Sequence, residues 1–114
     1  MISNCNEIYI SGWGGATNNR ANGIVGSTIN LPITSDAYQK TSDSSDFFFM
    51  VLEPNFKSLK YATFFGGLTL NEHVDGGTSR FSRDGTIYQA ICAGCASCYG
   101  CSGSSAFPTS PGAY

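Results

Sequence analysis

The amino-acid sequence predicts an all-β fold of short antiparallel strands. Apolar residues either alternate with polar ones or stand in short runs that end at glycine, proline or aspartate, which is typical of strands and turns. No segment places apolar residues at helical spacing. The composition agrees, because Gly occurs 14 times, Lys and Arg together occur 6 times, and charged residues make up only 12% of the chain. We therefore expect a single β-repeat domain over residues 1–114 with a modest core.

The first expected strand covers residues 8–11, where two isoleucines alternate with Tyr9 and Ser11 before a Gly-Trp-Gly-Gly sequence. A long loop over residues 14–35 follows, with room for one short strand near 23–29. The alternation in the first strand predicts that it is half-buried.

The next strand, 47–52, consists of six consecutive apolar residues, which predicts burial on both faces. A third strand is expected at 60–64 and a fourth at 87–91, just after a tight turn at Asp84-Gly85. Alternation around the third strand places four residues on one side: Leu59, Tyr61, Thr63 and Phe65. The residues expected to form the core or an assembly surface are Phe47, Phe48, Phe49, Tyr61 and Phe64.

Two motifs occur twice in the chain, in the same order. The sequence IYISGWGG at Ile8 is repeated as IYQAICAG at Ile87, and LPITSDAY at Leu31 is repeated as FPTSPGAY at Phe107. The two offsets are 79 and 76 residues, which indicates one structural unit that restarts. We expect a first unit over about 7–85 and the start of a second over about 86–114. The alternative is a chance likeness between unrelated strands.

Seven segments, read in order, resemble a known family. They are IYISGWGG, LPITSDAYQ, DFFFMVL, LKYATFFGG, EHVDGGTSRF, GTIYQAICAGC and FPTSPGAY. Together they resemble the β-propeller-type repeats of large secreted surface proteins of Bacteroidota, found beside gliding-motility and type IX secretion proteins. The resemblance implies a four-stranded antiparallel blade, an extracellular location and a structural or adhesive role without a known catalytic site. The small β-sandwich is the alternative fold.

A propeller needs about four to eight blades to cover its sheet faces and edges, and the chain offers roughly one and a half units. The missing strands must come from a longer chain or from neighbouring copies. Repeats that dock head to tail without closing form filaments. We therefore expect self-association into a fibre or another multi-copy assembly, with the segment after Cys101 lying across a neighbour.

Four cysteines follow one another at every third position, and one more lies near the N-terminus. They are Cys92, Cys95, Cys98 and Cys101, with Cys5 as the fifth. In an oxidising compartment this pattern favours disulfides, with one thiol left over and Cys5 as a plausible partner for the cluster. A metal or iron–sulfur site on the four clustered cysteines is an alternative, and unpaired thiols are another. The resembled family has a shorter CAGC at this place.

Other candidate sites are weaker. Trp13 and Tyr99 are candidates for stacking on sugars, together with Tyr9, Tyr38 and Tyr88, although burial between blades is the favoured explanation for such large aromatic residues. A catalytic triad of His73, Asp75 and Ser79 would require these three side chains to converge from one glycine-rich loop. Asp75 and Asp84 could ligate calcium, but Asp-Gly is first of all a turn sequence. We expect no enzyme activity and no cofactor.

The charge of the chain limits its partners. A formal net charge of −2 provides no basic surface for nucleic acid, and no run approaches the roughly 18 apolar residues of a membrane span. The cysteines and composition indicate an extracellular or cell-surface protein, with any export signal outside this sequence and Met1 as an internal methionine. The leading function is a structural or adhesive module, followed by a carbohydrate-binding segment that takes glycans, and then by a metal or Fe–S protein.

Overall fold

The computed structural model describes residues 1–14, 26–67, 72–73, 79–93 and 107–113. In these residues the chain is all-β, its strands pair antiparallel, and the helical structure is limited to one short 3-10 turn. The predicted all-β class is therefore confirmed. The division into propeller-blade units stays a prediction.

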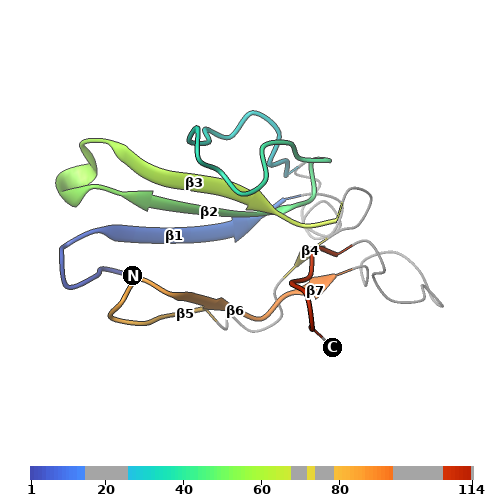
Figure 1. Ribbon diagram of the computed structural model, residues 1–114. Coiled ribbons are helices and arrows are strands. Elements are labelled where there is room, and N and C mark those ends of the chain that lie inside the picture. The colour runs from blue at the N-terminus through green and yellow to red at the C-terminus, as the bar shows by residue number, and fades with distance from the viewer. Residues whose placement is uncertain (15–25, 68–71, 74–78, 94–106, 114) are drawn as a thin grey trace.

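The main sheet is a three-stranded antiparallel sheet in the order β1 (Ile8–Trp13), β2 (Phe47–Leu52) and β3 (Leu59–Phe65) (Figure 1). The 3-10 turn η1 (Pro54–Phe56) lies between β2 and β3. All three strands were expected from the sequence, and the bounds of β2 agree with the expectation. As the middle strand, β2 pairs on both edges, which fits its continuous apolar sequence.

Four short strands between residues 72 and 93 form two further sheets of two strands each. Here β5 (Ser79–Phe81) pairs with β6 (Ile87–Gln89), and β4 (Glu72–His73) pairs with β7 (Cys92–Ala93). The fourth expected strand, 87–91, thus corresponds to β6, which ends at Gln89, whereas β4, β5 and β7 were not expected. The predicted turn is present, since Gly85 takes a φ of 88° and its N–H donates to the carbonyl of Ser82 at 3.2 Å.

One face of the main sheet, which we call the core face, is covered by the connection between β1 and β2. Phe48, Ala62 and Phe64 are buried there, with Leu31 and Ile33 packed against them. Leu59 also packs on this cluster. Its expected place beside Tyr61 and Thr63 was wrong, because the register of β2 and β3 shifts between Val51 and Leu52.

The same connection also pairs with the outer edge of β3. Thr34 forms hydrogen bonds with both backbone groups of Ala62. The Thr34 N–H donates to the Ala62 carbonyl at 3.2 Å, and Thr34 Oγ1 accepts from the Ala62 N–H at 3.2 Å. The N–H of Phe64 donates to the Gln39 carbonyl at 3.2 Å. This edge is therefore covered within the chain.

The opposite face, which we call the groove face, carries every second residue of each strand. The β5–β6 hairpin lies against its β1 side: the rings of Tyr9 and Phe81 are 4.9 Å apart, and the hydroxyls of Ser11 and Ser79 are 3.4 Å apart. The hairpin therefore forms a second layer that covers only part of this face.

Candidate functional site

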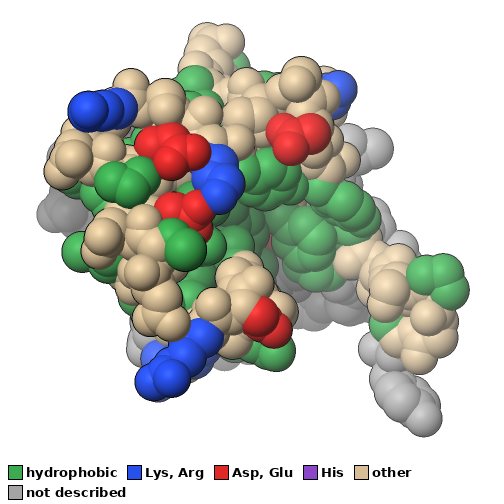
Figure 2. All heavy atoms as spheres, turned by 60° about the vertical axis from the view of Figure 1, so that its left-hand side comes forward, with side chains coloured by type: hydrophobic (Ala, Val, Ile, Leu, Met, Phe, Trp, Pro, Cys, Tyr) green, Lys and Arg blue, Asp and Glu red, His purple; other side chains and the backbone are tan. Residues whose placement is uncertain are grey.

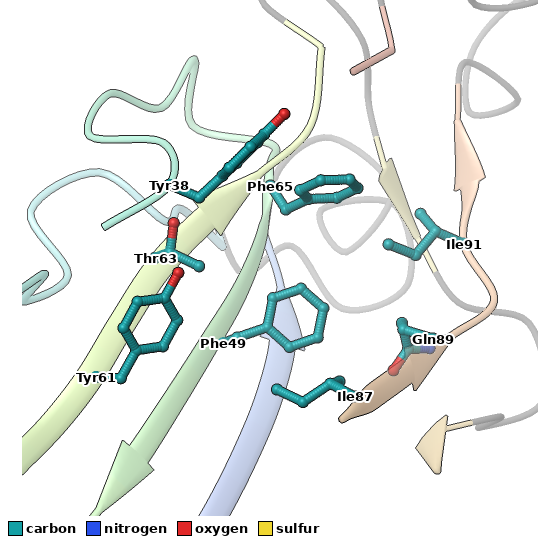
Figure 3. Close-up of a pocket in the computed structure, with 8 residues that line it drawn as sticks. All are labelled: Tyr38, Phe49, Tyr61, Thr63, Phe65, Ile87, Gln89 and Ile91. Atoms are coloured by element: carbon teal, nitrogen blue, oxygen red, sulfur yellow. The ribbon is translucent and has the colours of Figure 1, made fainter. Parts of the chain in front are cut away.

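The incomplete second layer leaves an apolar groove of about 410 Å³ between the groove face and β6 (Figure 3). One wall comes from β2 and β3, and the other comes from β6 and the residues that follow it. The lining residues are Tyr38, Phe49, Tyr61, Thr63, Phe65, Ile87, Gln89 and Ile91. None of them is charged, so this groove presents a mainly hydrophobic surface.

Aromatic rings form the rim of the groove. Tyr38 is 65% exposed, and its ring centroid lies 5.7 Å from that of Phe65. The ring of Phe107, near the C-terminus, meets Phe65 edge to face at 5.2 Å. Figure 2 shows that hydrophobic side chains also reach the surface on the face that it presents, with charged groups among them.

Two polar side chains of the groove, those of Thr63 and Gln89, are engaged by the protein. Thr63 Oγ1 accepts from the Gln39 N–H at 2.9 Å. Gln89 Oε1 accepts from the hydroxyl of Ser79, and its Nε2 donates to the Ala90 carbonyl at 2.8 Å. The lining of the groove is therefore mainly apolar, with a few polar side chains among the hydrophobic ones.

A pair of buried carboxyl groups lies elsewhere, beside Gly66. Asp46 and Glu72 are both fully buried. Asp46 accepts from the N–H of Asp43 at 3.0 Å and from Gln39 at 3.2 Å, while Glu72 Oε1 accepts from the N–H of Gly67 at 2.9 Å. Burial, followed by the nearby charges of Asp46 and Asp43, raises the pKa of Glu72 to about 7. The pair was missed from the sequence, because nothing local marks two carboxyls 26 positions apart as neighbours.

We expect Glu72→Gln to change the pH dependence of stability. A carboxyl whose pKa rises from 4.5 to about 7 on folding holds its proton more tightly in the folded state. The free energy of unfolding is therefore highest below pH 4.5 and falls as the pH rises to about 7. Urea unfolding from pH 4 to pH 8 should show a loss of about 3 kcal/mol in the wild type.

In Glu72→Gln this decline should largely disappear. Asp36→Asn, which removes an exposed carboxyl in a turn, provides the matched control and should keep the wild-type decline. A decline of equal size in Glu72→Gln and the wild type would show that another group is responsible.

The cysteine predictions fall mostly outside the described residues. Cys5 lies in a turn as an exposed, free thiol, and the backbone of Cys92 pairs with His73. Cys95, Cys98 and Cys101 lie outside the described residues, so the choice between disulfides, a metal and free thiols stays a prediction. In the part of the chain that the structure describes, no three His, Cys, Asp or Glu residues form a metal-binding group.

Trp13 does not line the groove. Its ring stacks on Phe47 at a centroid distance of 6.4 Å and an interplanar angle of 11°. Tyr99 lies outside the described residues, so sugar stacking by Trp13 and Tyr99 stays a prediction. Phe47, Phe48 and Phe64 are buried as expected, whereas Phe49 and Tyr61 line the groove.

The structure also bears on the candidate catalytic triad and on the candidate calcium ligand Asp84. Ser79 bonds to Ser11 and Gln89, and Asp75 of the proposed triad lies outside the described residues. Asp84 holds the turn, since it accepts from the hydroxyl of Ser82 and from the N–H of Thr86 at 3.0 Å. These bonds lower the pKa of Asp84 to about 2. Asp84 therefore acts as a turn residue.

The fold and the groove define an all-β antiparallel module with one partly covered sheet face. Across the described residues, no helix has the length and apolar character to cross a membrane. The chain matches no family model, no curated protein and no solved structure. Its function must therefore be argued from its own geometry.

Proposed function

We propose that the chain is an extracellular structural or adhesive β-repeat module, a building block that joins further copies or further repeats into a fibre or similar assembly. The observation that carries this proposal is the apolar groove, in which a sheet face is covered on one side and left open on the other. Water contact with such a face is unfavourable, and apolar surface of this kind is typical of an interaction site.

Two further observations support an assembly role. Large apolar side chains are exposed around the second layer, among them Tyr38 at 65% and Tyr88 at 59%. The groove has no charged lining residue, and two of its polar side chains, Thr63 and Gln89, bond within the protein. A second protein surface of apolar character complements it well.

Sedimentation velocity of the 114-residue chain over a wide concentration range, followed by electron microscopy of the largest species, tests this function. We expect concentration-dependent association into elongated particles, because each copy would contribute one open face. A compact monomer at every concentration would contradict the proposal.

A carbohydrate-binding segment is the second candidate, and the rim of the groove favours it. Tyr38 and Tyr61 combine aromatic rings with hydroxyl groups, and ligand sites commonly join apolar walls to a few polar groups. Under this alternative, Tyr38→Ala should abolish glycan binding measured by calorimetry on a panel of oligosaccharides. Tyr88→Ala is the matched control, since Tyr88 is exposed but does not line the groove. Absence of binding to any glycan would leave the assembly role.

A further inference from the structure

Two turns, 79 positions apart, have the same hydrogen bonds. The N–H of Ser3 donates to the carbonyl of Glu7 at 2.9 Å, and the N–H of Ser82 donates to the carbonyl of Thr86, also at 2.9 Å. The serine hydroxyl of each turn accepts from the N–H of the last residue, at 3.1 Å for Glu7 and 3.2 Å for Thr86. The likeness of the sequences at Ile8 and Ile87 thus extends backwards into the turns that precede them.

The strand pairs next to these turns follow the same register. Asn6 and Gly85 hold equivalent positions, and both have a positive φ, of 62° and 88°. The first pairs beyond the turns are Ile2 with Ile8, and Phe81 with Ile87. Therefore β6 is the counterpart of β1, and residues 1–2 stand where the end of β5 stands.

The second repeated motif also folds alike in its two copies. The N–H of Ala37 donates to the carbonyl of Thr34 at 3.1 Å, and the N–H of Ala113 donates to the carbonyl of Ser110 at the same distance. The first occurrence of the motif, at residues 31–38, lies on the core face of the main sheet. In the second occurrence, which starts at Phe107, the ring of Phe107 contacts Phe65 on the groove face. The second copy of the motif therefore lies beside the groove.

The equivalence identifies which edge of β6 has no strand. In β1, both backbone groups of Tyr9 bond to Met1 at 2.8 Å, so Ile8 and Ile10 direct theirs to β2. By the same alternation in β6, Tyr88 bonds to β5, and Ile87 and Gln89 direct their N–H and C=O groups to the other edge. Among the described residues, no strand pairs with that outer edge of β6.

We infer that the outer edge of β6 pairs with β2 of a second copy of this chain, in the place that β1 of that copy otherwise holds. This inference rests on the proposed function and specifies the joint between copies. The register of β1 and β2 carries over: Ile87 stands opposite Leu52 of the second copy, and Gln89 stands opposite its Met50.

The groove explains why such an occupant is favoured. Opposite residues of an antiparallel pair lie on the same face, and Ile87 and Gln89 line the groove. Met50 and Leu52 of the incoming strand therefore lie on the groove side, and Met50 brings with it the core cluster of its own copy, against which it packs. This match between an uncharged groove and an apolar strand selects a second copy of the chain rather than a charged partner.

The exchange replaces one strand by its counterpart, as in domain swapping. The β2 strand gives up six residue pairs with β1 and gains a pairing with β6, which is three residues long, so burial of the groove has to supply the difference. Each copy offers one β6 edge and one β2 strand, so the contact is head to tail and can continue from copy to copy. An open fibre follows when the rotation between copies does not close a ring.

A proline at position 89 tests the joint. Gln89→Pro removes an N–H that points away from β5 and should leave the hairpin paired. Sedimentation should show that Gln89→Pro needs at least a tenfold higher concentration to associate than the wild type does. Arg83→Pro is the matched proline control, because Arg83 is an exposed turn residue, and it should associate like the wild type. Gln89→Ala separates the loss of the side chain from the loss of the N–H and should weaken association less than the proline does.

The outcomes separate the joint from the function. If Gln89→Pro associates like Gln89→Ala, the β6 edge is not the joint, while the proposed function stands. If the wild type does not associate, both the joint at the β6 edge and the proposed function are wrong.

A photo-crosslinker provides a test that does not require a stable proline variant. Gln89 is replaced by p-benzoylphenylalanine in ¹⁵N-labelled chain, which is mixed with unlabelled chain and irradiated. Mass spectrometry should find crosslinks between labelled and unlabelled chains at Met50 or its neighbours in β2. Crosslinks between chains that consistently map elsewhere would overturn the inference.

Discussion

Phe48→Ala is expected to lower the free energy of unfolding by about 3–5 kcal/mol, the usual cost of deleting a buried phenylalanine ring. Phe48 is 4% exposed, and its ring centroid lies 5.6 Å from that of Phe64. Loss of the ring leaves a cavity under the segment that covers the core face, where Leu31 packs. Urea unfolding followed by circular dichroism measures the change.

Phe56→Ala is the control for this substitution. Phe56 lies in the turn η1 and is 67% exposed, so its removal should change stability by less than about 0.5 kcal/mol. Equal effects of the two substitutions would mean that the core face does not carry the stability of the domain.

Gly66→Ala is expected to reduce stability by about 2–3 kcal/mol, at the upper end of overpacking costs. A β-carbon at Gly66 would lie 2.8 Å from Glu72 Oε2 and closer still to Asp46 Oδ1. Both carboxyls are fully buried, so neither can move away without loss of its hydrogen bonds. Thermal unfolding monitored by circular dichroism should show a clearly lower midpoint.

The matched glycine substitution is Gly12→Ala in β1. A β-carbon there has no neighbour within 4 Å, and alanine is at least as favourable as glycine in a strand. Its midpoint should stay at or above that of the wild type. A midpoint for Gly66→Ala that matches Gly12→Ala would contradict the close packing of the carboxyl pair.

The strands with strong apolar patterns could be predicted from the sequence. The run at 47–52 coincides with β2, and the alternation near Ile8 corresponds to β1, because hydrophobic burial decides both. Strands β4, β5 and β7 were missed, since they are short and their pairing depends on contacts with other short strands rather than on an apolar pattern. The side assigned to Leu59 was wrong because a register shift has no clear sequence signal.

The groove could be predicted only in part. The sequence indicated that Phe49 and Tyr61 need a covering partner, and both line the groove. It gave no indication that Ile87 and Gln89 form the opposite wall, because this contact depends on how the hairpin packs against the sheet. Which edge of β6 is open was identified from the hydrogen bonds around Ser82, and the sequence alone does not show these bonds.

Amide hydrogen exchange at Gln89, measured at low and high protein concentration, tests the assembly account most directly. The account predicts that the Gln89 N–H exchanges rapidly in dilute solution and becomes protected as the concentration rises, because β2 of another copy then accepts its hydrogen bond. The neighbouring Tyr88 N–H, which faces β5, should be protected at both concentrations. A Gln89 exchange rate that does not change with concentration, in samples that sediment as the same compact monomer, would contradict the account.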